Sequence, residues 1–339
     1  MNVLGVCAGQ GVMLYPFRKY LLGNIEPRGV FYTKNNNQWK GNFGIIPMVK
    51  SIEEMPVSFR GQTVDVIIGH PDCGHSSMLA YSRAKKLSDP LENHSLLKFI
   101  KTVNLFKPKL FLMENLEKFL TNVGQENFEN TMRDFKMVYI TGSVSNFGNS
   151  QKTRKRLVIV GVNKTFFGKN TKKITRHFRK VYPVNEIRTT GKLIDDLMGE
   201  DISIGHIRED IDSVITMYAG QKYSLREIRD KWVSKPGTSR WEVSDRKFTT
   251  APAVYRNVFG CYPATARKSN RQFNPRGLQM SPRELARIQG IPDGFKIYFE
   301  PENLLYWINK GRLAVTKTPP MEISTWFKRR LSTLPIPIN

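Results

Sequence analysis

The sequence predicts an α/β fold, with a doubly wound, mostly parallel β-sheet and a smaller basic second domain. Three observations support this prediction. Apolar runs of four to six residues recur through the first half of the chain, segments with helical apolar spacing alternate with them, and a basic, irregular stretch begins near residue 165. Short continuous apolar runs are typical of strands that are covered by helices on both faces, as in parallel sheets.

Six apolar runs are the expected strands. They are Val3–Cys7, Gly29–Tyr32, Val64–Ile68, Leu110–Met113, Met137–Ile140 and Leu157–Val162. Residues 96–105 keep one face apolar and predict an amphipathic helix. A second helix is predicted after Ser281 as N-cap, with Pro282 and Glu284 in its first turn and Gly290 after its end. We expect a large domain over 1–164, a small basic domain over 165–275, and a segment over 276–339 that returns to the large domain.

The charge balance indicates a polyanionic partner. The chain has 53 Lys and Arg against 29 Asp and Glu, a formal net charge of +24, which is far more than solubility requires. Nucleic acid is the natural partner of so basic a chain. No apolar run approaches the roughly 20 residues of a membrane span, so we expect no membrane partner, and the first residues do not form a signal peptide.

Cysteine usage bears on the compartment and on metals. Cys7, Cys73 and Cys261 are odd in number and far apart, which fits a reducing compartment better than a disulfide scaffold. No Cys and His cluster has zinc-site spacing, so no metal is expected. These features predict a soluble protein of the cytoplasm.

The most informative cysteine lies on a turn after the third apolar run. Residues 65–77 read Asp-Val-Ile-Ile-Gly-His-Pro-Asp-Cys-Gly-His-Ser-Ser, so Cys73 follows a buried strand that Gly69, Pro71 and Gly74 end. This position favours a nucleophile beside a cleft. A lone cysteine is otherwise more often a small buried hydrophobe, and this motif alone leaves that alternative open.

Polar residues also follow or precede other predicted strands. Glu114 and Asn115 end the fourth run, at the carboxyl edge where open α/β sheets bind ligands, although an isolated carboxylate is more often a cap or a surface group. Arg154 and Arg156 share one face of an extended chain, where they form either an anion site or a solvated basic face. Residues 7–11, Cys-Ala-Gly-Gln-Gly, either let a cofactor approach the backbone or form a structural turn.

The order of these motifs resembles the cytosine-C5 DNA methyltransferase family. Gly-x-Gly, Pro-x-Cys, Glu-Asn and Arg-x-Arg follow one another as in that family, and Phe106–Lys109, Phe147-Gly148 and Arg283–Asp293 also fit. The resemblance covers residues 3–163 and about 249–330. It implies a divergent, phage-type member with a class I methyltransferase-like Rossmann fold, in a bacterium or a phage-infected host cell.

The resemblance also implies a covalent mechanism on a cytosine that is flipped out of the duplex. Cys73 would add to carbon 6 and thereby activate carbon 5, while Glu114, supported by Asn115, would protonate or hydrogen-bond N3. Arg154 and Arg156 would hold the O2 atom and a neighbouring phosphate.

The resemblance implies S-adenosylmethionine, or a derivative of it, as the methyl donor and cofactor. The expected cofactor-binding residues are Cys7, Ala8, Gly9, Gln10, Gly11, Lys34, Ser51, Ile52, Pro71 and Lys317. The expected DNA contacts are Ser76, Ser77, Arg240, Arg267, Lys268 and Arg271. We expect a monomer on DNA, with RNA as an alternative substrate.

The chain departs from the family around the predicted nucleophile. Asp72 stands where the family has a second proline, and an inward carboxylate there would disfavour the thiolate, which His75 could offset. Only about 20 residues separate the segment 250–254 from Arg276. This short spacing predicts weak sequence specificity, because it leaves little room for loops that read bases.

The donor side departs further. The family places an acid after the second strand, where it binds the ribose, and an Asp near the adenine. The corresponding positions here are expected to be Thr33 or Lys34, and Ser51, so both of these acids are missing. Glu53 and Glu54 lie close enough to substitute. Three hypotheses follow: an S-adenosylmethionine-dependent methyltransferase, an enzyme with another one-carbon or substituted-methyl donor such as an anionic S-adenosylmethionine derivative, and an inactive DNA-binding homologue.

Overall fold

The computed structural model describes fourteen parts of the chain, which form two compact units. The described residues are 1–27, 36–72, 94–151, 154–181, 188, 190–197, 215–218, 221–224, 240–241, 253–255, 272–273, 281–297, 315 and 318–338. Unit 1 comprises residues 1–148, 154–183 and 319–339, and unit 2 comprises residues 149–153 and 184–318.

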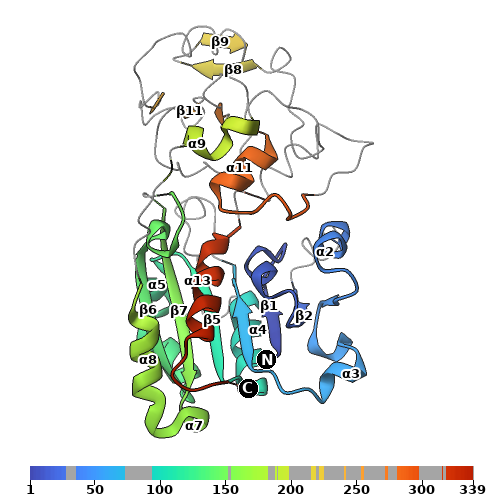
Figure 1. The fold of residues 1–339 in the computed structure, drawn as a ribbon, viewed down its shortest axis with the longest axis vertical. Coiled ribbons are helices and arrows are strands. Elements are labelled where there is room, and N and C mark those ends of the chain that lie inside the picture. The colour runs from blue at the N-terminus through green and yellow to red at the C-terminus, as the bar shows by residue number, and fades with distance from the viewer. Residues whose placement is uncertain are drawn as a thin grey trace. The chain divides into compact units, whose positions relative to one another are not determined.

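A seven-stranded sheet forms the centre of unit 1 (Figure 1). Its strands are β1 (Val3–Val6), β2 (Leu21–Ile25), β3 (Met48–Val49), β4 (Val66–Gly69), β5 (Leu110–Asn115), β6 (Phe135–Ser143) and β7 (Lys155–Asn163). They are ordered β3-β2-β1-β4-β5-β7-β6. All neighbours from β3 to β5 pair in parallel, and β7 is antiparallel to both β5 and β6. The predicted doubly wound, mostly parallel sheet is confirmed.

Helices cover both faces of the sheet because successive strand residues point to opposite sides. Val3 and Val66 belong to one buried cluster, and Leu4 and Ile67 belong to the other. The first cluster is covered by η1 (Val12–Phe17), α2 (Asn36–Phe43), α8 (Thr171–Arg179) and α13 (Met321–Ser332). The second is covered by α3 (Val57–Arg60), α4 (His94–Phe106), α5 (Phe119–Val123) and α6 (Gln125–Thr131). The predicted helix over 96–105 is therefore part of α4.

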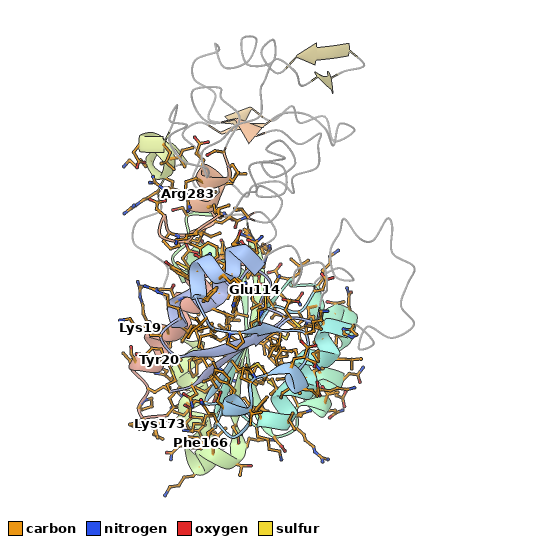
Figure 2. All side chains as sticks on the ribbon, turned by 90° about the vertical axis from the view of Figure 1, so that its right-hand side faces the viewer. Lys19, Tyr20, Glu114, Phe166, Lys173 and Arg283 are labelled. Atoms are coloured by element: carbon orange, nitrogen blue, oxygen red, sulfur yellow. The ribbon has the colours of Figure 1, made fainter. Side chains whose placement is uncertain are left out.

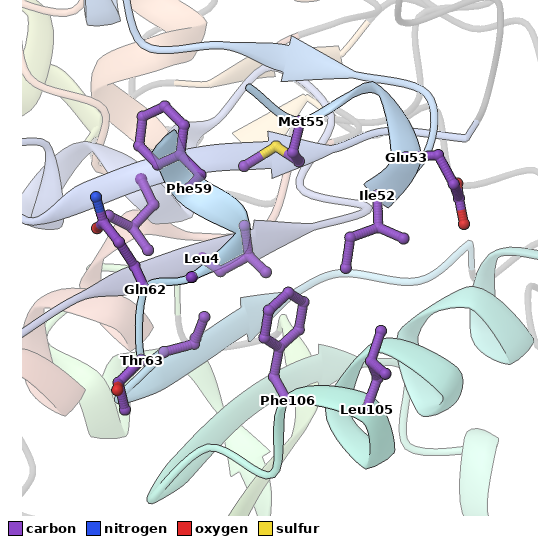
Figure 3. A pocket seen from close by; sticks show the side chains of 12 residues that line it. Leu4, Ile52, Glu53, Met55, Phe59, Gln62, Thr63, Leu105 and Phe106 are labelled. Atoms are coloured by element: carbon purple, nitrogen blue, oxygen red, sulfur yellow. The ribbon is translucent and has the colours of Figure 1, made fainter. Parts of the chain in front are cut away.

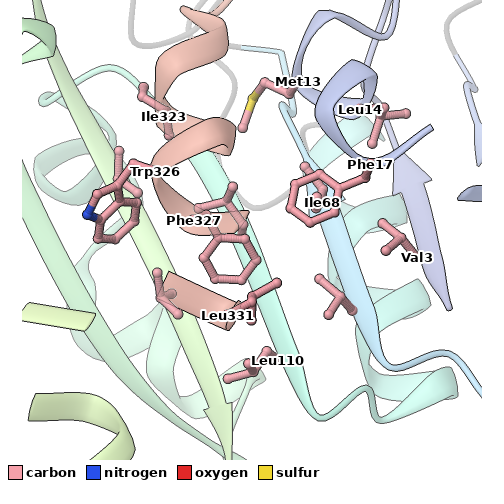
Figure 4. Packing of buried hydrophobic residues seen from close by; sticks show 14 of the residues in the cluster. Val3, Met13, Leu14, Phe17, Ile68, Leu110, Ile323, Trp326, Phe327 and Leu331 are labelled. Carbon is pink, nitrogen blue, oxygen red and sulfur yellow. The ribbon is translucent and has the colours of Figure 1, made fainter. Parts of the chain in front are cut away.

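The last helix, α13, returns the chain to unit 1. Ile323, Trp326, Phe327 and Leu331 recur at helical spacing and are buried (Figure 4). The ring of Phe327 lies 5.4 Å from that of Phe178 in α8. Residues 319–339 belong to unit 1, and residues 276–318 belong to unit 2.

Two boundaries differ from the expectation. The second strand is β2, whose Leu-Leu-Gly-Asn-Ile sequence has low strand propensity and gave no signal; the strand predicted over 29–32 lies outside the described residues. The basic segment after residue 165 begins in unit 1, because α8 buries Ile174 and Phe178 and exposes its cations on the outer side.

Three short elements, η2 (Ile52–Glu54), η4 (Val144–Phe147) and α7 (Lys164–Phe167), connect the strands.

Unit 2 contains the predicted capped helix, α11 (Pro282–Ile288). The Ser281 hydroxyl accepts from the Glu284 N–H at 3.2 Å, and the Ser281 N–H donates to the Glu284 carboxylate at 2.7 Å. Arg287 joins α11 to Asp196 and Asp293 at 2.5 and 2.7 Å. The other elements are α9 (Thr190–Ile194), η6 (Asp195–Leu197), a hairpin of β8 (Ile215–Tyr218) and β9 (Gln221–Ser224), and a sheet of β10 (Arg240–Trp241), β11 (Ala253–Tyr255) and β12 (Gln272–Phe273).

A search for helices that could cross a bilayer, over the part of the chain that the structure describes, finds none with the necessary length and apolar character.

Candidate active site

Strand register brings three polar side chains together at the carboxyl edge of unit 1. Gly69 at the end of β4 pairs with Met113 in β5, so the next residue, His70, lies opposite Glu114. Glu114 in turn pairs with Val158 in the antiparallel strand β7. Because alternate residues of a strand share a face, Arg156 points to the same side as Val158 and thus as Glu114.

Glu114 lies at the centre of this cluster and is fully buried (Figure 2). One carboxylate oxygen, Oε2, is 2.5 Å from His70 Nδ1, and the other, Oε1, is 2.8 Å from Arg156 Nε. The His70 side chain is 15% exposed and the Arg156 side chain 11%, so all three groups are largely withdrawn from water. The carboxylate is therefore held from both sides by charged or chargeable nitrogen donors.

The charge balance around Glu114 favours its ionised form. Burial alone would raise the pKa of this carboxyl, because a charge is disfavoured in a poorly solvated environment. His70, Arg156 and Arg154 outweigh that effect and hold the pKa below its ordinary value. Arg156 thus contacts Glu114 directly, and the charge of Arg154 also acts on this carboxylate.

The turn after β4 is fixed by neighbouring elements. The Pro71 carbonyl accepts a hydrogen bond from the Asn115 amide at 3.3 Å, and the Asp72 N–H donates to the Ser95 hydroxyl at 2.7 Å. Asp72 is exposed at this turn. Cys73, the predicted nucleophile, lies outside the described residues and follows directly after this fixed turn.

The Gly-x-Gly loop after β1 is a tight turn with left-handed backbone. Cys7, Gly9 and Gly11 have φ values of 56°, 58° and 81°. A Cβ atom at Gly11 would lie 2.5 Å from the ring of Phe43, so the loop requires glycine there. Gln10 accepts from Gln38 at 2.7 Å, and the Cys7 thiol donates to the Ser95 carbonyl at 3.3 Å.

An acid, Glu26, directly follows the second strand. It is fully buried and accepts a hydrogen bond from the Gly9 N–H at 2.7 Å. The assignment of this position to Thr33 or Lys34 rested on a second strand over residues 29–32, whereas the second strand of the sheet is β2. Lys34 and Lys317 themselves lie outside the described residues.

The residues around this loop fit a bound S-adenosylmethionine. Asn24, two positions before Glu26, is fully buried, and its side-chain Nδ2 has no hydrogen-bond partner among the described residues. An orphaned donor beside a buried carboxylate is suited to a polar ligand. The predicted Ser51 is the N-cap residue of η2, and Ile52 is its first residue.

A cavity of about 580 Å³ lies in unit 1 and is lined by Ile52 (Figure 3). Its other walls include Leu4, Leu22 and Val64, which stand at the amino-terminal ends of β1, β2 and β4. Neither Glu26 nor Glu114 lines this cavity.

Of the predicted DNA contacts, only Arg240 is among the described residues, where it forms part of β10. Ser76, Ser77, Arg267, Lys268 and Arg271 lie outside them.

Three residues around the site, His70, Glu26 and Ser95, were not predicted from the sequence. Alternate residues of a strand share a face, so the position of His70 two residues after Ile68 could have indicated it as a site residue. Glu26 could have been recognised only if the position of β2 had been predicted correctly.

Comparisons with known proteins give the class of the fold. A protein described as a DNA modification methyltransferase encoded within an Escherichia coli prophage superposes with a TM-score of 0.64 at 17% identity, covering 98% of this chain and 99% of that one. A DNMT2 variant of Spodoptera frugiperda gives a TM-score of 0.60 at 14% identity, covering 97% and 99%. The fold is thus the Rossmann-like fold of these methyltransferases.

The sequence gives the family. The family of C-5 cytosine-specific DNA methylases matches residues 26–308, and the chain belongs to this family. Type II methyltransferase M1.HphI of Haemophilus parahaemolyticus is 26% identical over 249 residues, which are 68% of this chain. That match spans 60% of the relative's length.

Proposed function

We propose that the protein transfers a methyl group from S-adenosylmethionine to carbon 5 of cytosine in DNA. The observation that carries this proposal is the position of Glu114, which is buried between His70 and Arg156 beside the turn that leads to Cys73. Family membership supports the reaction type. S-adenosylmethionine, when bound, supplies an activated methyl group.

The residues of the chain have distinct roles in this proposal. The thiolate of Cys73 adds to carbon 6 of the flipped base, which converts carbon 5 into a nucleophile. Glu114 directs a proton to N3, and Asn115 holds the turn through the Pro71 carbonyl. Arg156 orients the Glu114 carboxylate, and Arg154 adds positive charge for the base oxygen or a phosphate.

The donor would be held by the loop over 7–11 and by Glu26. Glu26, which follows β2 and accepts from the Gly9 N–H, would bind the ribose hydroxyls, and the small glycines allow close approach to the backbone. The hypothesis of an anionic or substituted donor rested on a missing acid and on Lys34 and Lys317, and Glu26 offers an acid after the second strand. We therefore propose S-adenosylmethionine itself.

Covalent trapping tests this function. Wild-type protein, incubated with S-adenosylmethionine and duplex DNA containing 5-fluorocytosine, should form an adduct that survives denaturation. Cys73→Ala should form none, while Cys261→Ala, a matched cysteine substitution at a position without a proposed role, should react normally. Mass spectrometry of nucleosides from ordinary cytosine DNA should show 5-methylcytosine.

The outcomes separate the remaining alternatives. A different mass increment with another donor would favour the altered-donor hypothesis, and reaction with RNA but not DNA would change the substrate class. Absence of both adduct and modified base would favour an inactive binding homologue.

A further inference from the structure

His70 stands out because its imidazole contacts the predicted acid rather than solvent. We infer that His70 is a positioning residue that supplies, through Glu114, the proton taken up by N3 of the cytosine when Cys73 adds to carbon 6. This inference rests on the proposed function and adds to it the source of the proton.

The contacts of Nδ1 identify it as a hydrogen donor. Nδ1 lies 2.5 Å from Oε2 of Glu114 and 3.3 Å from the backbone carbonyl of the same residue. A carbonyl oxygen can only accept, so the nitrogen that faces it carries the hydrogen. The same hydrogen is positioned toward the Glu114 carboxylate.

Among the residues that the structure describes, the other charged groups around Glu114 cannot supply this proton. The charged side chains that act on Glu114 are His70, from the turn after β4, and Arg154 and Arg156, from the start of β7, while Asp72 is exposed. Arginine does not release a proton in proteins. Glu114 is itself ionised near neutral pH, because His70, Arg156 and Arg154 lower its pKa despite its burial. Among these groups the imidazole is the one that holds a transferable hydrogen against the carboxylate.

The proton transfer balances with the covalent step. The sulfur lone pair of Cys73 forms the S–C6 bond, the C5=C6 electron pair becomes the C4=C5 bond, and the C4=N3 pair takes a proton at N3. That proton comes from Oε2 of Glu114, which receives the Nδ1 proton of the His70 imidazolium. The pair begins as imidazolium and carboxylate and ends as imidazole and carboxylate, while the negative charge of the thiolate is consumed. When the S–C6 bond breaks, the N3 proton returns by the same path.

The test is the pH dependence of adduct formation. His70→Asn keeps an N–H donor near the position of Nδ1 but cannot titrate, so we expect the trapping rate near neutral pH to fall by roughly 10²- to 10⁴-fold. The pH profile of the wild type should differ from that of the variant on its alkaline side, because the variant has no ionisable side chain at this position. The acid side of the two profiles should be alike.

Two further variants make the result decisive. His70→Gly leaves room for added imidazole, which should restore the trapping rate in proportion to its protonated fraction. His177→Gln is the matched control, because His177 contacts the Arg330 carbonyl in α13 at 2.8 Å and has no role in the site; it should keep the wild-type profile. Circular dichroism melts establish that each variant is folded.

The inference is overturned if folded His70→Asn keeps the wild-type rate and pH profile, or if imidazole gives no rescue of folded His70→Gly. A wild-type protein that forms no adduct would overturn the proposed function, and this inference with it. The two failures are therefore distinguishable.

Discussion

The buried carboxylate of Glu114 is tolerated because its ion-pair partners come from neighbouring strands. A fully buried, unpaired carboxylate costs several kcal/mol or more, and such a group normally takes up a proton instead. Here His70 and Arg156 each contact one oxygen, and they are placed by register rather than by flexible loops. The ion pairs that stabilise the Glu114 carboxylate therefore also keep it unprotonated, so it must receive a proton from another group before it can pass one on.

The lowered pKa of Glu114 predicts a specific acid sensitivity. A carboxyl with a depressed pKa in the folded state adds stability above its unfolded pKa, about 4.3, and loses it as pH falls through the folded value. The free energy of unfolding of the wild type, measured by urea denaturation between about pH 6 and 3, should therefore fall more steeply than that of Glu114→Gln. Parallel pH curves for the two proteins would contradict the prediction.

Glu26 is expected to determine donor affinity. Hydrogen bonds to a charged group contribute about 1.5–3 kcal/mol, so Glu26→Gln should weaken S-adenosylmethionine binding by roughly 10- to 100-fold in calorimetric titration. Glu126→Gln, on the exposed side of α6, is the matched control and should bind normally. Equal affinities for the two variants would show that the ribose is held elsewhere.

At the scale of elements, the sequence predicts five of the seven strands and both of the helices it singles out. Continuous apolar runs such as Leu157–Val162 are unmistakable because both faces of the strand are buried. The strand β2 could not be predicted, because Gly23 and Asn24 interrupt the run. Because β2 was missed, the position after the second strand was assigned to Thr33 or Lys34 rather than to Glu26.

The antiparallel pairing of β5 and β7 depends on Gly161. Gly161 pairs with Phe111, and a Cβ atom there would lie 1.9 Å from the Phe111 ring, which also packs 5.7 Å from the ring of Phe99. Gly161→Ala should therefore lower the free energy of unfolding by about 3 kcal/mol in urea denaturation. Gly61→Ala, where the added methyl group meets nothing within 4 Å, should change it by less than about 1 kcal/mol. Equal effects would disprove the proposed close packing.

At the scale of the whole molecule, composition predicts the kind of partner better than the places of contact. The formal charge of +24 belongs to the full chain, and α8 shows that part of it lies on the outer face of unit 1. Arg283 and Arg287 of unit 2 instead serve structure, since Arg283 donates to the Phe295 carbonyl at 2.8 Å and Arg287 pairs with two aspartates. Spacing alone could not separate these structural arginines from phosphate contacts.

The net charge predicts steep salt dependence of DNA binding. Each neutralised phosphate releases counterions, so a protein with at least six phosphate contacts loses roughly 10³-fold or more in affinity between about 50 and 200 mM salt. Fluorescence anisotropy with a labelled duplex should show a linear fall of the logarithm of the binding constant with the logarithm of salt concentration. Because this term is independent of sequence, unlabelled duplexes of unrelated sequence should compete almost equally, in line with the weak specificity that we expect. A binding constant that changes less than about tenfold over this range, or a preference above about a hundredfold for one short site, would mean that base contacts rather than backbone charge dominate recognition.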